Sequence, residues 1–521
     1  MNFNLALDPW ISVATAKGPE LLSLRDTFAR AEGITDLALP PHERIFILRL
    51  LLCISQAALD EHLEYDDAIP GLREKLSSAA LNYLDQWQHS FELLGNGPRF
   101  LQLRTSKKDT TSAAKLSLAL SSGNNPTLLD HAALLPRQFS AQELALSLIS
   151  FLNFSPLIGR GYRGRGPAVE SNMRHTFLHG ATLLDTLTRN LLSYQTLADG
   201  GLKMGKPVWE NMPDLSKPDP EMIDNATTTY LGRLCPLSRA VWLLDGESII
   251  LDNGLSFPGP EEILEPSAAT RLIKTSATQE KLITLAVKPE RAAWRELDAV
   301  LAHGEKAKRP LHLQNAILFP ESTIAIWTGG LTTDFQAKIE NSASSLFAGE
   351  SAIPCDFLTG GPEPLVRYRG GIKAASDWAN AIGKATTEFA RRMQSSKGAN
   401  DKNSQKKIKD PFKVPAEADF WSRLEQHLPT LYAYALDPSA NISTKAETLG
   451  FAYSSENPYN LSAWHKLAER TARECYLRAC DPDRSRNMIA FVQGESQLWP
   501  KNSQKKEIEA YKKEIKDRNA A

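Results

Sequence analysis

The longest apolar block in the chain predicts a buried helix. Residues 42–63, HERIFILRLLLCISQAALDEHL, are apolar on nearly every helical face, which is typical of a helix covered on most sides. The run from Ile45 to Leu59 within it contains Arg49 and is too short to cross a bilayer. We therefore expect a core helix here and no membrane partner.

Two local patterns in the first 154 residues indicate where elements begin and end. Residues 3–13, FNLALDPWISV, alternate apolar and polar positions on both sides of an Asp-Pro pair, which predicts two short strands joined at a turn. Ser140 and Glu143 have the spacing of a capping box, so we expect a helix that begins there and runs to about Phe154.

The pattern changes after Phe154. Residues 155–180 are rich in glycine and arginine and lack periodicity, which predicts an irregular loop, and residues 181–194 predict another helix. From about Thr228 to Leu331, short apolar runs bounded by Gly, Pro and Asp predict an antiparallel sheet. These runs are residues 229–237, 239–244, 248–252, 281–287 and 322–331.

Helical periodicity dominates the chain after about Gly361. Apolar positions recur at helical spacing in residues 376–393, 418–436 and 462–479, with a further helical stretch near the end. Residues 394–413 are polar and basic without periodicity, which predicts a mobile connection between the first two helices. The charged tail, residues 501–521, predicts a solvated, fraying helix.

These patterns together predict an α+β protein with two domains. A chain of 521 residues is too long for one hydrophobic core. We expect a mixed N-terminal domain with an antiparallel sheet and helices at residues 1–362, followed by a C-terminal four-helix bundle at residues 363–521.

Composition indicates a soluble, cytoplasmic protein. Hydrophobic residues make up 42% and charged residues 23% of the chain, the balance of a globular protein. The N-terminal residues lack a basic segment and a small-residue cleavage site, so no export signal is visible. Five scattered cysteines are too few for a disulfide framework, and we expect free thiols.

The overall charge restricts how the chain can bind nucleic acid. Lys and Arg number 60 against 61 Asp and Glu, so the chain lacks the basic excess of a protein that coats nucleic acid alone. Any contact must therefore be local, and partner subunits would neutralise most phosphates.

A run of glycines with basic residues is the most distinctive motif. It comprises Gly159, Arg160, Gly161, Tyr162, Arg163 and Gly164. Its GxGxxG spacing binds a pyrophosphate where a strand precedes and a helix follows, but here a helix and Ser-Pro precede and Arg-Gly-Pro follows. Alternatively, the glycines allow close backbone approach to nucleic acid while arginine and tyrosine side chains supply charge and stacking. A solvated loop with locally paired arginines fits the residues equally well.

Catalytic motifs are absent from the sequence. GxSxG, GxxxxGK[ST] and HExxH do not occur, so we expect no enzyme activity and no cofactor. A metal site could use His131, His175, His179 and Asp130 if the last two histidines shared a helix face, but the local sequence lacks a helical pattern. We therefore expect no bound metal.

Several stretches, taken in order, resemble the CasA family, the large subunit of the type I-E CRISPR surveillance complex Cascade. Residues 3–13 resemble the opening strands of the family, 120–131 its variable loop and 155–167 its glycine loop. Further stretches follow in the order of the family: residues 229–244, 286–297, 327–347, 419–432 and 464–480. The collinearity over nearly the whole chain carries the resemblance.

The resemblance implies a non-catalytic subunit that recognises DNA. The N-terminal domain would read the protospacer-adjacent motif (PAM) in double-stranded target DNA, start unwinding beside it, and recruit a helicase-nuclease. The bundle would contact the small subunits and steady the displaced strand. Other implied partners are the guide RNA within the complex and the backbone and 5′-handle-binding subunits.

Residue roles are implied position by position. The glycine loop of the family falls on Gly159, Gly161 and Gly164, and its minor-groove lysine lies near Arg271 or Lys274. The wedge that enters the duplex falls on Asp334, Phe335 or Gln336, with a helix opening near Thr333 or Asp334. The guide-proximal loop comprises Ser122, Gly123, Asn124 and Asn125. The cysteine-rich zinc insertion of some members is absent here.

Three alternatives remain open. The chain could be a helical scaffold that binds proteins only, or a nucleotide-binding enzyme that uses the glycine loop at residues 159–166. Phe335 could be an ordinary core residue, because apolar residues in the first turn of a helix often are.

Overall fold

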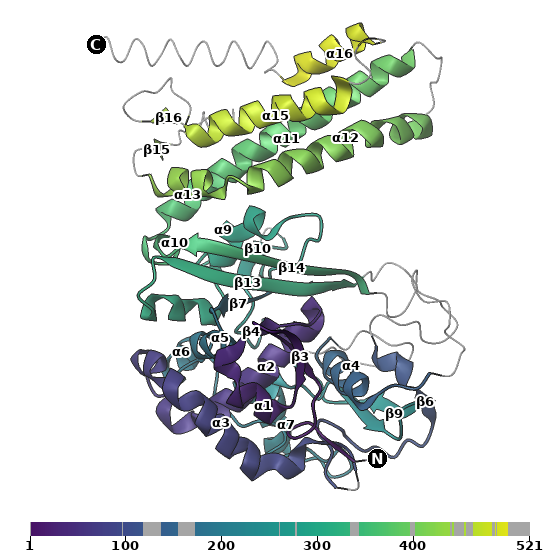
Figure 1. Cartoon of the computed structure of the whole chain (residues 1–521), viewed down its shortest axis with the longest axis vertical. Helices are drawn as coiled ribbons and strands as arrows, with labels where there is room; N and C mark the ends of the chain where they lie inside the picture. Colours follow the sequence, from purple (N-terminus) through teal and green to yellow (C-terminus); the bar gives the residue numbers. More distant parts are fainter. Residues whose placement is uncertain are drawn as a thin grey trace. The chain divides into compact units, whose positions relative to one another are not determined.

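The computed structural model divides the chain into two compact units, Met1–Leu358 (unit 1) and Thr359–Ala521 (unit 2) (Figure 1). The structure describes residues 2–521 except 96, 118–136, 155–171, 260, 277–278, 334–342, 396–401, 438–439, 442–452, 455–461, 482–484, 486 and 499–521. Unit 1 contains helices and several small antiparallel sheets, and helices dominate unit 2. The predicted α+β class is therefore confirmed.

Unit 1 combines short helices with small antiparallel sheets. Its helices are α1 (Leu24–Ala29), α2 (Pro41–Ala58), α3 (Arg73–Trp87), α4 (Ala141–Phe154), α5 (Leu183–Arg189), α6 (Tyr194–Asp199), α7 (Pro220–Thr228), α8 (Tyr230–Leu234), α9 (Leu297–Leu301) and α10 (Asp356–Thr359). Its strands, in the order in which they pair, are β1 (Phe3–Asn4) with β5 (Glu92–Leu94); β3 (Gly18–Leu22), β2 (Ile11–Thr15) and β4 (Ile34–Leu37); β6 (Thr110–Ser112), β9 (Ser248–Asn253) and β8 (Arg239–Leu243); β11 (Glu280–Thr284), β10 (Thr270–Lys274) and β12 (Ala307–Lys308); and β14 (Ala343–Pro354), β13 (Thr323–Thr333) and β7 (His175–His179).

Helix α2 is the predicted core helix. Every residue from Arg44 to Gln56 is buried, which confirms that the helix is covered on nearly all sides. The predicted capping box is also confirmed. The Ser140 N–H donates to the Glu143 carboxylate at 2.8 Å, the Glu143 N–H donates to the Ser140 hydroxyl at 3.2 Å, and the helix ends at Phe154.

Two predicted strand and loop assignments are wrong. Residues 229–237 contain helix α8, because the Thr229 hydroxyl caps it by accepting from the Gly232 N–H at 3.3 Å. The predicted loop at 155–180 contains strand β7, whose residues His175 to Leu178 are all buried. Strand β13 pairs with β7 along its whole length, from Ala325 with His179 to Gly329 with His175.

The predicted helix at 181–194 is broken into α5 and α6. The Asn190 side chain, just after α5, accepts from the Leu178 N–H at 2.9 Å and donates to the Leu178 carbonyl at 2.7 Å. A backbone held by a buried side chain in this way cannot continue the helix. Ser193 then caps α6 by accepting from the Thr196 N–H at 3.0 Å.

A buried charge network joins three elements of unit 1. Arg49 of α2 forms an ion pair with Glu265 at 2.5 Å, and its guanidinium also donates to the backbone carbonyls of Arg233 (2.6 Å) and Leu234 (3.2 Å) at the end of α8. The Ser267 hydroxyl donates to Glu265 at 3.2 Å and lies 2.8 Å from His175 Nδ1 in β7. All these side chains are buried.

The charge state of Glu265 follows from its neighbours. Burial opposes ionisation, but the charges of Arg49, His175 and Arg233 outweigh it, so the pKa of Glu265 lies below its usual value of 4.5. The carboxylate is therefore charged in the folded protein at neutral pH, and Arg49 neutralises it.

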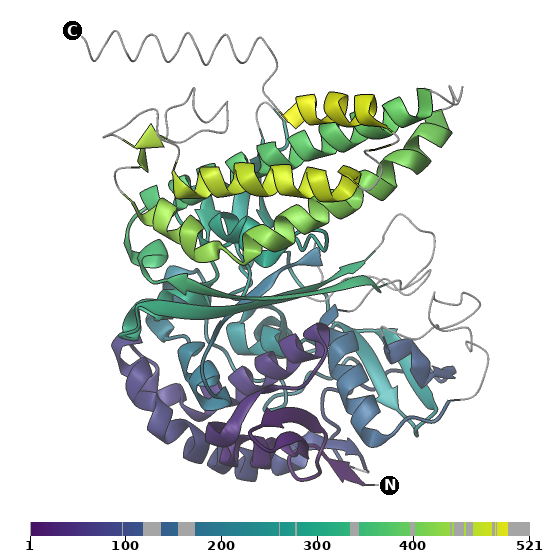
Figure 2. The same ribbon diagram turned by 45° about the horizontal axis from the view of Figure 1, so that its top comes forward.

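Unit 2 is built around one long helix. Its helices are α11 (Glu363–Ser395), α12 (Lys402–Glu425), α13 (Leu428–Leu436), α15 (Ala463–Cys480) and α16 (Met488–Glu495), and its short strands are β15 (Ala440–Asn441) and β16 (Tyr453–Ser454). Helices α12, α15 and α16 pack against α11 in Figure 2. The Trp464 indole donates to the Gly371 carbonyl at 2.9 Å, and a Cβ on Gly371 would lie 2.6 Å from Leu431.

The predicted connection at residues 394–413 is wrong in part, because α12 already begins at Lys402 and contains Pro411 and Pro415. Residues 396–401 and the predicted tail helix lie outside the described residues. No helix among the described residues is both long and apolar enough to cross a bilayer. The five cysteines form no disulfide with one another, and the described residues contain no cluster of His, Cys, Asp and Glu arranged to hold a metal.

The buried ion pair generates a stability prediction. Arg49→Met leaves the Glu265 charge buried without its partner and should lower the free energy of unfolding by about 3–5 kcal/mol, measured by urea denaturation at pH 7. The double variant Arg49→Met/Glu265→Leu should lose much less free energy of unfolding. Because the folded pKa of Glu265 is lowered, the pair stabilises fully above about pH 4.5 and its contribution disappears as pH falls through the folded pKa.

A suitable control is Arg30→Ala, which removes an exposed pair with Glu20 and should leave the unfolding curve unchanged. Equal behaviour of Arg49→Met and this control would contradict a structural role for the network.

Candidate nucleic-acid interface

The longest strands of unit 1 form a hairpin that extends toward the predicted wedge. Strands β13 and β14 pair from Thr323 with Pro354 to Thr333 with Ala343, and the hairpin crosses unit 1 in both views (Figures 1 and 2). The predicted wedge residues Asp334, Phe335 and Gln336 directly follow β13 and lie outside the described residues. Thr333, one of the two predicted starts of a helix here, is the last residue of β13 and pairs with Ala343, so the helix does not begin at Thr333.

The other loop residues predicted for nucleic-acid contact also lie outside the described residues: Gly159, Arg160, Gly161, Tyr162, Arg163 and Gly164, and Ser122, Gly123, Asn124 and Asn125. The structure describes the residues on both sides of these segments. Those flanking residues define the candidate site.

Close backbone packing explains the Trp-Thr-Gly-Gly sequence in β13. The Arg44 guanidinium of α2 lies 4.6 Å from the centre of the Trp327 ring, which holds the indole against the core. A Cβ on Gly329 would lie 2.3 Å from that indole, and a Cβ on Gly330 would lie 2.7 Å from the Met173 carbonyl oxygen. Gly329 therefore leaves room for the Trp327 indole, and Gly330 lets the chain at Met173 approach β13 closely.

Residues Asn172 to His175, which directly follow the glycine-rich segment, join two hairpins. The Arg174 N–H donates to the Leu285 carbonyl at 2.9 Å, and the Val287 N–H donates to the Asn172 carbonyl at 2.8 Å, beyond the end of β11. On the other side, His175 pairs with Gly329 of β13. The described residues that follow the glycine-rich segment therefore contact both hairpins, the first at the chain just after β11 and the second within β13.

A cluster of cations surrounds one carboxylate at this junction. Buried Arg174 pairs with Glu296 at 2.7 Å, Lys288 pairs with it closely, and Arg291 lies 3.5 Å from it. Burial opposes ionisation of Glu296, but the hydrogen bond from Lys288 and the charges of Arg174 and Lys288 outweigh it and lower the pKa of Glu296. Three cations on one carboxylate leave an excess of positive charge.

Sequence reasoning missed this cluster. Arg174 also lies 5.0 Å from the centre of the Phe347 ring of β14, so it connects the junction to the second strand of the long hairpin. The dense basic spacing of the stretch at residues 288–296, KPERAAWRE, was a signal for Lys288 and Arg291. Nothing in the sequence signals that Arg174 pairs with a carboxylate 122 residues away.

The predicted basic finger lies on an exposed hairpin. Arg271 and Lys274 are both in β10 and exposed, and neither forms an ion pair with any residue that the structure describes. They lie three positions apart in a strand, so their side chains point to opposite faces of the sheet. Lys281 of β11 stands opposite Ile273 and shares the face of Arg271, whereas Lys308 of β12 stands opposite Thr270 and shares the face of Lys274.

The order of elements around the glycine-rich segment excludes the pyrophosphate-binding arrangement. Helix α4 ends at Phe154 before the segment, and strand β7 begins at His175 after it. A dinucleotide-binding GxGxxG needs the opposite order, a strand before the glycines and the N-terminus of a helix after them.

The histidine pair considered as a metal site is also separated. His175 and His179 stand at the two ends of β7, about 13 Å apart at the rise of a strand rather than on one helical face. His175 contacts Ser267, and His179 Nε2 lies 3.9 Å from Asp36. The two imidazoles cannot share one ion.

Known proteins share sequence and fold with this chain over most of its length. The family model for CRISPR-associated protein Cse1 matches residues 4–475. CRISPR-associated protein CasA/Cse1 of Thermus thermophilus is 26% identical over 458 residues, which cover 83% of this chain and 87% of the relative.

Solved structures agree. Thermobifida fusca Cse1 has a TM-score of 0.70 at 20% identity, covering 95% of this chain and 98% of that chain. A chain of a CRISPR RNA-guided surveillance complex has a TM-score of 0.68 at 19% identity, covering 96% of this chain and all 100% of its own length. As its sequence patterns indicated, the chain belongs to the Cse1 (CasA) family of CRISPR-associated proteins.

Proposed function

We propose that the chain is the non-catalytic large subunit of an RNA-guided CRISPR complex of the Cascade type. It recognises the PAM in double-stranded target DNA, starts unwinding there, and helps to recruit the helicase-nuclease. One observation carries this proposal: Asn172 to His175 join the flank of the glycine-rich segment to both hairpins, one that carries the exposed cations Arg271 and Lys274 and one that leads to the wedge positions. In the proposed function, these segments, which are far apart in sequence, would act on one stretch of duplex.

The role proposed for each contact follows from the chemistry of the DNA grooves. The minor groove shows a degenerate pattern of donors and acceptors, so a reader there accepts several related sequences. Glycine-rich backbone can approach the groove closely, an exposed cation from β10 can hold the register, and an inserted wedge offsets an unstacking cost of a few kcal/mol. Pairing with the guide then supplies sequence specificity.

The charge balance supports a role within a complex. Because the chain has a formal net charge of −1, its exposed cations can make only a few phosphate contacts. Partner subunits would supply the rest. The exposed cations Arg271 and Lys274 are available for the few local contacts that this role requires.

A glycine substitution tests the loop. Gly161→Val should weaken binding of the assembled complex to PAM-containing DNA, because a Cβ blocks close backbone approach. Assembly with the other subunits should be unchanged, as measured by size-exclusion chromatography. Equal loss for targets with and without a PAM, in a mobility-shift assay, would argue against PAM reading by this segment.

The two finger candidates can be separated by charge removal. Arg271→Ala and Lys274→Ala are compared in the assembled complex, with Arg30→Ala as a control for loss of one positive charge elsewhere. The finger variant should bind PAM-containing DNA more weakly and reduce the slope of log K against log salt by about 1, because one phosphate contact is lost. If neither variant differs from the control, β10 does not contact DNA.

The wedge is tested with two targets. Changing Asp334, Phe335 and Gln336 together to Ala should reduce binding to a fully paired target by about tenfold or more, because the unstacking cost of a few kcal/mol is no longer offset. Binding to a target with a pre-opened bubble beside the PAM should be largely retained.

Ser351→Ala, at the other end of the same hairpin, serves as the matched control. Loss of binding to both targets, together with a lowered melting temperature of the isolated chain, would instead mean that Phe335 is an ordinary core residue.

A further inference from the structure

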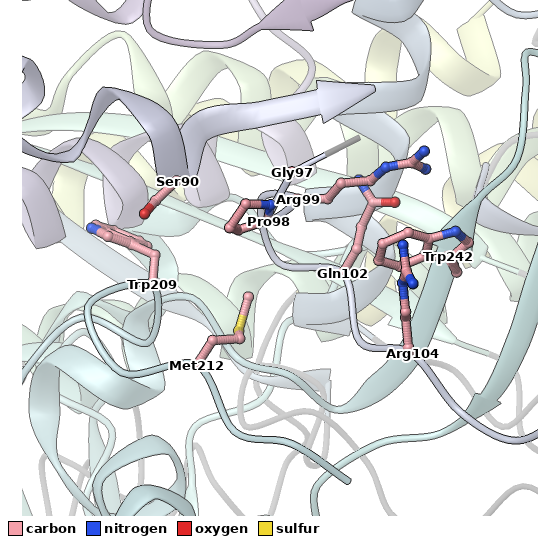
Figure 3. A pocket seen from close by; sticks show the side chains of 9 residues that line it. All are labelled: Ser90, Gly97, Pro98, Arg99, Gln102, Arg104, Trp209, Met212 and Trp242. Carbon is pink, nitrogen blue, oxygen red and sulfur yellow. The ribbon is translucent and has the colours of Figure 1, made fainter. Parts of the chain in front are cut away.

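A pocket of about 190 Å³ in unit 1 brings two arginine side chains to one indole. Figure 3 shows the guanidinium groups of Arg99 and Arg104 next to the Trp242 indole, with Met212 across the pocket. The Cζ atoms of Arg99 and Arg104 lie 4.4 and 4.1 Å from the centre of the Trp242 ring. Both distances are those of a cation–π contact. The indole therefore holds two positive charges on one side of the pocket.

The chain between the two arginines turns sharply at Leu101. This residue has a φ of +53°, in the left-handed region that leucine rarely adopts. Its side chain is fully buried, and the Gln102 amide beside it donates to the Leu93 carbonyl at 2.7 Å and accepts from the Leu243 N–H at 2.9 Å. These contacts hold an unfavourable backbone conformation. Because such strain is concentrated at functional sites, the turn points to a binding role for this pocket.

Arg99 is largely committed to the protein. Its Nε donates to the Gly95 carbonyl at 2.9 Å, and its Nη1 donates to the Leu243 carbonyl. Burial and the positive charge of Arg104 lower the pKa of Arg99, although the charge of Glu92 acts in the opposite sense. The two cations therefore repel each other, and a negative charge bound beside them would relieve that repulsion.

Arg104 is the cation that remains available. The residue is exposed, and it forms no hydrogen bond or ion pair within the part of the chain that the structure describes. Contact with Trp242 holds its guanidinium group, whose N–H groups can still donate. A guanidinium held in this way suits a planar carboxylate, to which it can donate two parallel hydrogen bonds.

The surface around the pocket carries both signs of charge. Three carboxylates lie within three residues of positions that line the pocket: Glu92, Asp214 and Asp245. Lys108 is an exposed cation on the same stretch as Arg104. A nucleic-acid backbone follows a continuous positively charged groove, which a surface of mixed charge does not provide. This mixture instead favours a ligand that carries one negative charge.

Apolar groups lie beside the cation. Pro98 and Met212 both line the pocket, and both are at least partly exposed. Leu244, two positions after Trp242, is 43% exposed, and its N–H donates to the Ser248 carbonyl at 3.0 Å, which continues the pairing of β8 with β9. Arginine, tryptophan and methionine are enriched at the centres of protein–protein interfaces. The residues at this pocket therefore resemble those of a protein-binding surface.

We infer that this pocket receives a glutamate side chain from a partner protein. The carboxylate would pair with the Arg104 guanidinium, and the methylene groups would cover Pro98 and Met212. Pockets for drug-sized ligands begin at about 300 Å³, so a pocket of about 190 Å³ suits a single side chain. This inference rests on the proposed function only in taking the partner to be another subunit of the complex.

Capped amino acids test the pocket on the isolated full chain. Acetyl-glutamate-amide supplies the carboxylate on its own stem, and acetyl-glutamine-amide is its neutral counterpart of the same shape. In NMR spectra of chain labelled with ¹⁵N at arginine and tryptophan, the glutamate probe should shift the Arg104 Nε–H and Trp242 indole signals until they saturate. The glutamine probe should leave both signals in place.

Substitutions measure the contribution of the cation. Arg104→Ala should weaken binding of the glutamate probe, followed at the Trp242 signal, by about tenfold or more, because a charge-assisted pair is lost. Arg104→Lys keeps the charge but not the planar fork and should weaken it less. Lys108→Ala removes the same charge from a nearby exposed position that does not line the pocket, and should bind as the wild type does.

A phosphate probe separates the two kinds of anion. Dimethyl phosphate carries one negative charge, as each phosphodiester of nucleic acid does. Tighter binding of dimethyl phosphate than of the glutamate probe would assign the pocket to nucleic acid. Equal shifts with the glutamine probe, or no saturable shift with the glutamate probe, would mean that the pocket does not recognise a carboxylate. Each of these results overturns the proposal.

Carbodiimide coupling identifies the partner in the assembled complex. Arg104→Lys places a primary amine in the pocket, and a carbodiimide condenses that amine with an adjacent carboxylate to form an amide. We expect mass spectrometry to find a cross-link, absent from the wild type, between position 104 and a glutamate of another subunit. The absence of a new cross-link, or a cross-link only to carboxylates of this chain, would overturn the proposal.

PAM-dependent DNA binding of the wild-type complex is measured separately. If it is absent while the glutamate probe binds and the cross-link forms, the proposed function fails and the pocket assignment stands. If it is present while the probe does not bind or the cross-link does not form, only the pocket assignment fails.

Discussion

The ion pair between Arg49 and Glu265 is the interaction on which the arrangement of unit 1 depends. A charge inside the most buried helix is costly unless it is neutralised and fully hydrogen-bonded. Glu265 neutralises it, and the carbonyls at the end of α8 take the remaining donors. The Ser267 hydroxyl bonds to both Glu265 and His175, so it connects the ion pair to the start of β7. The charge of Arg49 in α2 thereby constrains the position of β7.

The position of β7 in turn decides where the proposed DNA-contacting segments meet. Strand β7 pairs with β13, and the residues just before it bond to the chain beyond β11. Gly330 permits this approach, because a Cβ there would meet the Met173 carbonyl, and Arg174 with Glu296 fills the junction beside β14. A rigid base of this kind suits loops that must present a few contacts in a defined geometry.

For contacts with nucleic acid, the local distribution of charge in this chain matters more than its net charge. The overall balance is almost neutral, but cations without carboxylate partners among the described residues occur at Arg271 and Lys274 on one hairpin and at Arg104 beside Trp242. In the proposed function, Arg271 and Lys274 would contact the target duplex.

The sequence alone determined the features that depend on neighbours along the chain. The buried helix at 42–63, the capping box at Ser140 and Glu143, and the helical C-terminal region follow from periodicity and local hydrogen bonding, and the family follows from collinear patterns. The tertiary structure decided what depends on distant partners. It made a strand of residues 175–179 because β13 pairs with them. It also paired Arg174 with Glu296 and Arg49 with Glu265, because a buried charge takes whichever carboxylate the fold brings to it, and no local pattern records that choice.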